Sequence, residues 1–406
     1  MSRIVVEFGA EEFDFDLPDE AVVGSWTGPK GLDRVEAESA LREAIERPRG
    51  YPPLRRNVAP GDRVTIALGA GLPDPGRIVA VLSEILGGSG VSPNDIKVLA
   101  PSGVDLGATA ATIVEHDPSD RDQLAYLATT AGGRRVYLNQ ALTDADVVLP
   151  VGLLGYDPLM GRRGPWSVLF PSLSDAPTLE ASRRDHPEES SPRGEPLDLS
   201  SEAFEVGWLL GSQFQIGVIP GVGGPVEFVA GLAEEVRNQG AAAVDRAWRF
   251  RVKDQAAVVV AGIGEPGSPT SVDALVEGLA TAGRLVQRGG KIVALSRAEG
   301  PIGPSLQRLA AAAETPDPPR ALRGFESDPD SVAARRLARV VSWADVYLLS
   351  GLDRDLVEDL SMIPLGRPEE ARRLVERSAT STFLSRAELT WGEMEPEPSK
   401  NRRSKQ

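Results

Sequence analysis

The stretch "IKVLAPSGVDLG", Ile96–Gly107, joins an apolar run to a Pro-Ser-Gly turn and then to an acid, Asp105. An apolar run that ends in such a turn is typical of a buried strand in an α/β sheet. Ligands of these sheets bind beyond the carboxyl ends of the strands. The pattern therefore predicts a strand from Ile96 onward and makes Asp105 a candidate site residue, although an aspartate here is equally suited to capping a turn.

Strands and helices alternate on both sides of this stretch. A hairpin is predicted near the start, a helix after Asp33, and a polar helix over about 120–130. The pattern restarts at Gln255, with a strand "AAVVVAGIG" and a helix beginning at Ser271. This order predicts an α/β protein of two α/β domains, residues 1–250 and 251–392, with mostly parallel sheets and an interdomain cleft. Residues 393–406 have the composition of a disordered tail.

Composition narrows the possible partners and chemistry. The 406-residue chain has a formal net charge of −15, which disfavours nucleic acid and anionic membranes as partners. The absence of cysteine excludes disulfides, thiolate nucleophiles and cysteine-ligated metals. We find no signal-peptide pattern and no apolar run long enough for a membrane helix, so a cytoplasmic protein with a small-molecule ligand is expected.

Histidine and lysine are both scarce. Only six residues are lysine, and the two histidines are His116 and His186. His116 lies in the polar segment "VEHDPSD", where we expect a solvated loop residue. His186 lies in a long Pro-, Gly- and Ser-rich segment over 155–201, and a surface position is expected there too.

Two glycine-containing motifs are candidates for ligand binding. "GIGEPG", Gly262–Gly267, matches the dinucleotide fingerprint in letters, but Ser271 is the better N-cap and an ordinary loop is favoured. "GRRGPW", Gly161–Trp166, places two arginines between glycines, and guanidinium groups bind carboxylate or phosphate in a bidentate manner. Arg162, Arg163 and Trp166 are therefore the predicted anion-binding residues, with a solvated loop as the alternative.

The order of these segments resembles the lactate racemase family, whose members use a nickel-pincer nucleotide cofactor. The resemblance runs from about residue 3 to residue 392. It rests on "VTIALGAGLPDP", "KVLAPSGVDLG", "ADVVLPVGLLGYDPLMGRRGPWSVLFP" and the strand–helix–strand segment that starts at "GEPGSPTSVDALVEG". It implies two α/β domains around an active-site cleft and racemisation or epimerisation of a 2-hydroxy acid.

The resemblance also implies which positions match the family's functional residues, and most of them differ here. The catalytic histidines match Asp105 and either Tyr156 or Asp157, and the lysine that tethers the cofactor falls near Trp166. The family's metal-binding histidine has no clear match. The second-domain residues match Asp273, Ala274 and Glu277, which include no cation.

These differences predict a divergent family member without nickel-pincer chemistry, hence with no cofactor-binding and no metal-binding residues. Asp105, Tyr156 and Asp157 remain the candidate catalytic residues by position. The alternative is a non-catalytic binding or regulatory protein that holds a small carboxylate in the cleft. A third hypothesis, nucleotide binding at Gly262–Gly267, is the weakest.

Overall fold

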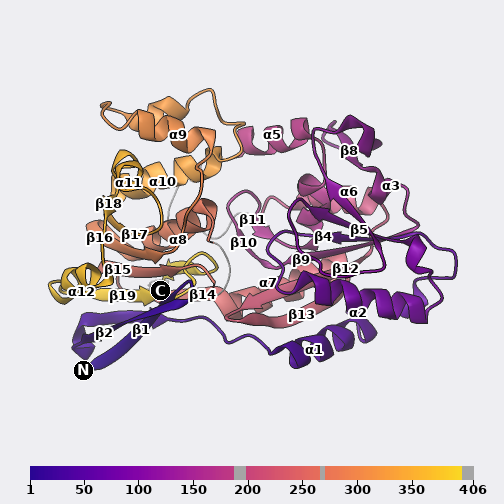
Figure 1. Ribbon diagram of the computed structural model, residues 1–406, viewed down its shortest axis with the longest axis horizontal. Helices are drawn as coiled ribbons and strands as arrows, with labels where there is room; N and C mark the ends of the chain where they lie inside the picture. Colours follow the sequence, from indigo (N-terminus) through magenta and orange to yellow (C-terminus); the bar gives the residue numbers. More distant parts are fainter. Residues whose placement is uncertain (187–197, 266–269, 396–406) are drawn as a thin grey trace, which may run out of the picture.

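The computed structural model describes residues 1–186, 198–265 and 270–395. Two six-stranded sheets lie side by side, each flanked by its own layers (Figure 1). The first has the order β13-β12-β9-β4-β5-β6, with bounds β4 Val64–Leu68, β5 Ile96–Pro101, β6 Thr112–His116, β9 Val147–Leu153, β12 Phe214–Gly221 and β13 Gly224–Leu232. All neighbours in it are parallel except β12 and β13.

The second sheet is wholly parallel and has the order β18-β17-β16-β15-β19-β3. Its strands are β3 Val22–Trp26, β15 Ala256–Ile263, β16 Val286–Ser296, β17 Asp345–Leu349, β18 Ile363–Pro364 and β19 Ser381–Leu384. The predicted α/β class with mostly parallel sheets is confirmed.

Helices cover both faces of the first sheet, which explains why β4 is buried at every position. One face packs against α1 (Arg34–Glu46) and α2 (Pro75–Gly88). The other packs against α4 (Pro165–Ser167), α6 (Ser201–Leu209) and α7 (Ala233–Trp248). The predicted N-cap is confirmed, because the Asp33 carboxylate accepts the backbone N–H groups of Val35 and Glu36 at 2.8 and 2.9 Å.

The second sheet packs differently on its two faces. One face carries α8 (Val272–Leu285), α9 (Pro304–Ala311), α10 (Ser331–Trp343) and α11 (Arg354–Asp359). The other carries the antiparallel hairpin of β1 (Ser2–Phe8) and β2 (Glu11–Leu17), together with α12 (Pro368–Glu376). The start of the chain therefore completes the second sheet, although the predicted boundary placed residues 1–26 with the first half.

Three short strand pairs and two helices are the remaining strands and α-helices of the described chain. They are the antiparallel pair β7 (Leu124–Thr129) and β8 (Arg135–Asn139), the hairpin β10 (Gly155–Asp157) and β11 (Gly161–Arg163), the parallel pair β14 (Arg249–Val252) and β20 (Trp391–Met394), and the helices α3 (Gln140–Thr143) and α5 (Ala176–Arg184). No helix in the described ranges is long and apolar enough to span a membrane.

Two sequence expectations about local structure are wrong. Most of the polar helix predicted over about 120–130 is instead a strand, β7, because Leu124–Thr129 pairs with β8. The predicted tail begins too early, since Glu393 lies in β20 and binds two arginines. The long segment over 155–201 also contains regular elements, while residues 187–197 lie outside the described part of the chain.

Candidate functional site

A cavity of about 780 Å³ lies between the two halves of the molecule. It opens where β4, β9, β15 and β19 end, so the carboxyl ends of parallel strands from both sheets face it. This is where ligands bind in open α/β sheets. The first half contributes α1, the start of α2, and the turn between β12 and β13. The second half contributes the start of α8 and residues 386–389.

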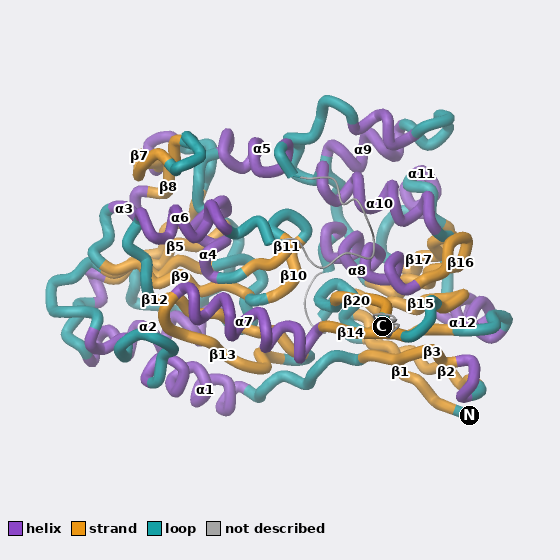
Figure 2. Tube along the Cα trace, turned by 180° about the vertical axis from the view of Figure 1, so that it is seen from behind, coloured by secondary structure: helices purple, strands orange, loops and turns teal. Residues whose placement is uncertain are grey.

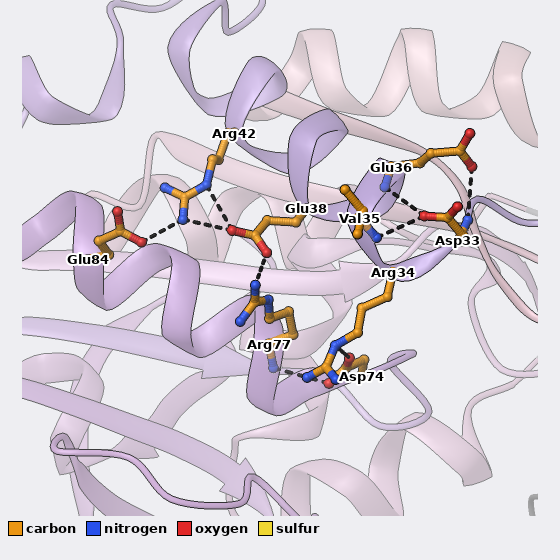
Figure 3. Close-up of polar contacts among 9 residues, drawn as sticks. All are labelled: Asp33, Arg34, Val35, Glu36, Glu38, Arg42, Asp74, Arg77 and Glu84. Atoms are coloured by element: carbon orange, nitrogen blue, oxygen red, sulfur yellow. Dashed lines mark hydrogen bonds and ion pairs between the residues drawn. The ribbon is translucent and has the colours of Figure 1, made fainter.

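Paired charges on α1 and α2 form one wall of the cavity (Figure 3). The Glu38 carboxylate accepts from Arg42 at 2.9 Å and also from Arg77, and Arg42 continues to Glu84 at 2.5 Å. Hydrogen bonds from Arg42 and Arg77 lower the pKa of Glu38. The Arg77 guanidinium on this wall is thus already neutralised by the Glu38 carboxylate.

A second arginine–acid cluster forms the opposite wall. Arg386 is 5% exposed, and its guanidinium lies 2.7 Å from Glu388 and 3.5 Å from Glu265. Its backbone is left-handed, with φ 56°, as is that of Asp74 on the facing wall, with φ 44°. Left-handed residues other than glycine are strained and gather at functional sites. Asp74 also forms an ion pair with Arg34 at 3.5 Å.

The hairpin β10–β11 lies between the two sheets (Figure 2). It carries Arg163, which differs from the other arginines of the cavity in its lack of an acidic partner in the described chain. Arg163 lines the cavity, is half-buried, and forms no ion pair with any described residue. Its buried Nε–H has no hydrogen-bond acceptor. A guanidinium with an unsatisfied buried donor beside an open cavity is suited to binding an anion.

The adjacent Arg162, unlike Arg163, is paired with an acid of the protein. Its guanidinium lies 2.8 Å from Asp245 of α7, and that carboxylate also accepts the Tyr156 hydroxyl at 2.8 Å. Burial raises the pKa of Tyr156, and the charge of Asp245 raises it further. Burial opposes ionisation of Asp245, but hydrogen bonds from Tyr156 and Arg162 outweigh it and lower the pKa. Tyr156 is therefore held as a neutral phenol.

Three other candidates have local structural partners. Asp157 caps a turn, accepting the backbone N–H groups of Leu159 and Met160 at 2.9 and 2.7 Å. Asp105 is exposed and accepts the N–H of Gly107 at 2.9 Å, in a similar turn. Trp166 is 2% exposed and stacks on Phe204 with ring centroids 4.9 Å apart. Of the six predicted site residues, only Arg163 lines the cavity between the two halves of the molecule.

Both histidines lie outside this cavity. His116 was expected in a solvated loop, but it ends β6 and is 8% exposed. Its Nε2–H donates to the Ser174 carbonyl at 3.0 Å, and Nδ1 lies 3.3 Å from the Asn139 amide nitrogen. His186 lines a different pocket, beside α10. The expectation of a surface position for His116 is wrong because its strand, β6, brings it against the segment around Ser174.

The His116 environment predicts a pH-dependent stability. Burial lowers the pKa of His116 in the folded protein below its unfolded value near 6.5. Protonation therefore favours the unfolded chain, and stability is lost as the pH falls below that unfolded value. Between pH 7.5 and 5.5 we expect denaturant unfolding to show a steeper loss in wild type than in His116→Gln, by up to about 1.4 kcal/mol per pH unit. Equal slopes would show that His116 does not contribute.

The glycine motif after β15 is explained in part by packing. A Cβ on Gly262 would meet the backbone carbonyl of Glu7 in β1, and one on Gly264 would meet the Thr270 hydroxyl. Ser271 is the N-cap of α8, accepting the N–H of Ala274 at 3.1 Å, as predicted. The remaining motif residues, Pro266 and Gly267, lie outside the described part of the chain.

Sequence reasoning missed the cluster of Arg386, Glu388 and Glu265. Arg386 follows the last strand of the second sheet, so its place at a carboxyl end was a usable signal. The pairing of these charges depends on how segments far apart in the sequence meet, and no local pattern records it.

Comparison with known proteins agrees with the architecture. The model of the lactate racemase N-terminal domain matches residues 8–190. A lactate racemase of Thermoanaerobacterium thermosaccharolyticum is 22% identical, with the alignment covering 93% of this chain and 95% of the relative. The chain is therefore similar to a lactate racemase over nearly its whole length, and residues 8–190 match that family's N-terminal domain. The family resemblance noted in the sequence is thereby confirmed.

Solved structures show the same fold over nearly the whole chain. The apoprotein of the T. thermosaccharolyticum lactate racemase superposes with a TM-score of 0.76 at 18% identity, covering 97% of this chain and all of that one. A protein from Thermotoga maritima superposes with a TM-score of 0.65 at 11% identity, covering 91% of this chain and all of its own. The family fold is therefore kept despite low identity.

Proposed function

We propose that this protein is a divergent lactate racemase family member that binds a small carboxylate in the interdomain cavity through Arg163 and does not carry the nickel-pincer cofactor. The observation that carries the proposal is the charge pairing of the cavity. Among the described lining residues, Arg34, Arg77 and Arg386 each have an acidic partner, whereas Arg163 has none.

The residues present do not fit the family's cofactor. The described cavity lining contains no histidine, lysine or cysteine. No group of three or more histidine, cysteine or acidic residues in the described ranges could hold a metal ion. Near the position matched to the tethering lysine stands Trp166, an apolar side chain packed in the core with no amine to form the attachment.

The groups that remain are poorly suited to moving a proton from carbon near neutral pH. A general base or acid works best when its pKa lies near the working pH. Tyr156 has a raised pKa, and Asp105 and Asp157 are exposed or turn-capping carboxylates away from the cavity lining. This supports binding of a carboxylate over its racemisation.

The carboxylate proposal predicts a ligand effect on thermal stability. Sodium L-lactate or D-lactate is expected to raise the melting temperature of the wild type, because a ligand that binds only the native state adds about 2.7 kcal/mol at a hundred times its Kd. Arg163→Ala is expected to abolish the shift by removing the unpaired guanidinium.

Arg34→Ala is the matched control, because it removes a cavity arginine whose charge is already paired with Asp74. It is expected to keep the lactate shift, and sodium chloride at equal ionic strength should give no shift in any variant. No shift in wild type, or an equal loss in both variants, would rule out Arg163 as the carboxylate site for lactate.

A further inference from the structure

A second cavity, of about 360 Å³, lies beside α10 and the short 3₁₀ helix Pro318–Leu322. It shares no lining residue with the interdomain cavity. Five arginines line it: Arg320, Arg323, Arg335, Arg336 and Arg339. We call this the arginine pocket.

The charge of the arginine pocket is opposite to that of the chain. Five arginines face two acids, Asp317 and Glu326, an excess of three positive charges before His186 is counted, in a chain of net charge −15. Arg336 is bound to Glu277 at 2.5 Å. With Arg336 and Arg339 left aside, three arginines of the lining, Arg320, Arg323 and Arg335, still outnumber its two acids.

The two acids of the pocket do not satisfy Arg320, Arg323 or Arg335. The Glu326 carboxylate accepts the backbone N–H of Gly324 at 2.9 Å, and backbone hydrogen bonds, ahead of the charge of Arg335, lower its pKa. Arg335 has a buried Nη2 with no hydrogen-bond acceptor. No ion pair joins Arg320, Arg323 or Arg335 to an acid of the described chain. A buried donor left without an acceptor is costly, and an anionic oxygen would satisfy it.

We propose that the arginine pocket binds a small polyanion that carries two or more phosphate groups. Arginine forks match phosphate oxygens in a bidentate manner, and several of them around one cavity suit several linked phosphates. The volume lies within the range of small-molecule sites. An extended polyanion is disfavoured, because the chain as a whole has a net charge of −15 and would repel it.

Titration calorimetry with sodium tripolyphosphate tests the proposal. Wild type is expected to bind one tripolyphosphate per chain, more weakly as salt increases. Arg320→Ala/Arg323→Ala removes two exposed arginines of the pocket. Loss of two charge-assisted contacts is expected to weaken binding at least about tenfold.

The matched control is Arg373→Ala/Arg377→Ala, which removes two exposed arginines near α12, outside the pocket. It is expected to change the affinity by less than about twofold. Arg163→Ala should bind tripolyphosphate as wild type does, which separates this site from the carboxylate proposal. The proposal is overturned by the absence of saturable binding, by an equal loss in the control, or by inorganic phosphate binding as tightly as tripolyphosphate.

Discussion

Replacing Arg249 by methionine is expected to lower the free energy of unfolding by about 2–3 kcal/mol, because it removes the guanidinium that donates charge-assisted hydrogen bonds to both Glu393 and Asp245. Arg249 is the first residue of β14, and its side chain is only 12% exposed. Its guanidinium binds both oxygens of Glu393 at 2.7 and 2.8 Å, and Asp245 at 3.1 Å. It thus connects α7 of the first half to β20 of the second half.

Arg251→Met is the matched control for this substitution. Arg251 also binds Glu393, at 2.7 Å, but its side chain is 50% exposed and the Arg249–Glu393 pair survives its loss. The control is expected to cost about 1 kcal/mol or less, as exposed ion pairs do. Urea unfolding of both variants measures the difference. Equal losses would show that the Arg249 cluster does not hold the two halves as described.

Trp166→Lys is expected to destabilise the protein by about 3–5 kcal/mol or to prevent folding, because it removes a large buried aromatic and places a charge in an apolar core. The sequence resemblance puts the family's tethering lysine near this position, so a lysine here would return an amine to that region. In this chain the indole is 2% exposed and stacks on Phe204, and its buried Nε1–H has no hydrogen-bond partner among the described residues. The surroundings therefore reject the residue that the family's chemistry needs.

Trp208→Lys is the control, because it makes the same change at a side chain that is 75% exposed. It is expected to change the free energy of unfolding by no more than about 0.5 kcal/mol. Thermal and urea unfolding of the two variants give the comparison. A Trp166→Lys protein as stable as wild type would mean that the position still accommodates a lysine.

Local signals predicted much of the fold. Apolar runs bounded by turns marked the buried strands, including β5 and β15, and capping residues marked the starts of α1 and α8. Where pairing overrides local pattern, prediction failed: β7 is a strand because β8 lies beside it, and β3 joins the far sheet because it pairs with β19. The residues of β7 and β3 do not by themselves indicate which strand each will pair with.

The candidate site was predictable only in part. The motif "GRRGPW" drew attention to the hairpin that carries Arg163, but nothing in the motif distinguishes Arg163 from Arg162. Their difference arises from Asp245, a residue of α7 about 80 positions away, which neutralises Arg162 and leaves Arg163 to the cavity. The burial of His116 likewise depends on contacts with distant segments, at Ser174 and Asn139.

Nickel content after co-production with the enzymes that make the nickel-pincer cofactor is the most direct test of the central claim. The T. thermosaccharolyticum lactate racemase, produced in the same cells, serves as the loading control. We expect the control to contain nickel and this protein to contain none above the level found without the cofactor enzymes. Nickel bound in near-stoichiometric amount, together with interconversion of D- and L-lactate, would contradict the account.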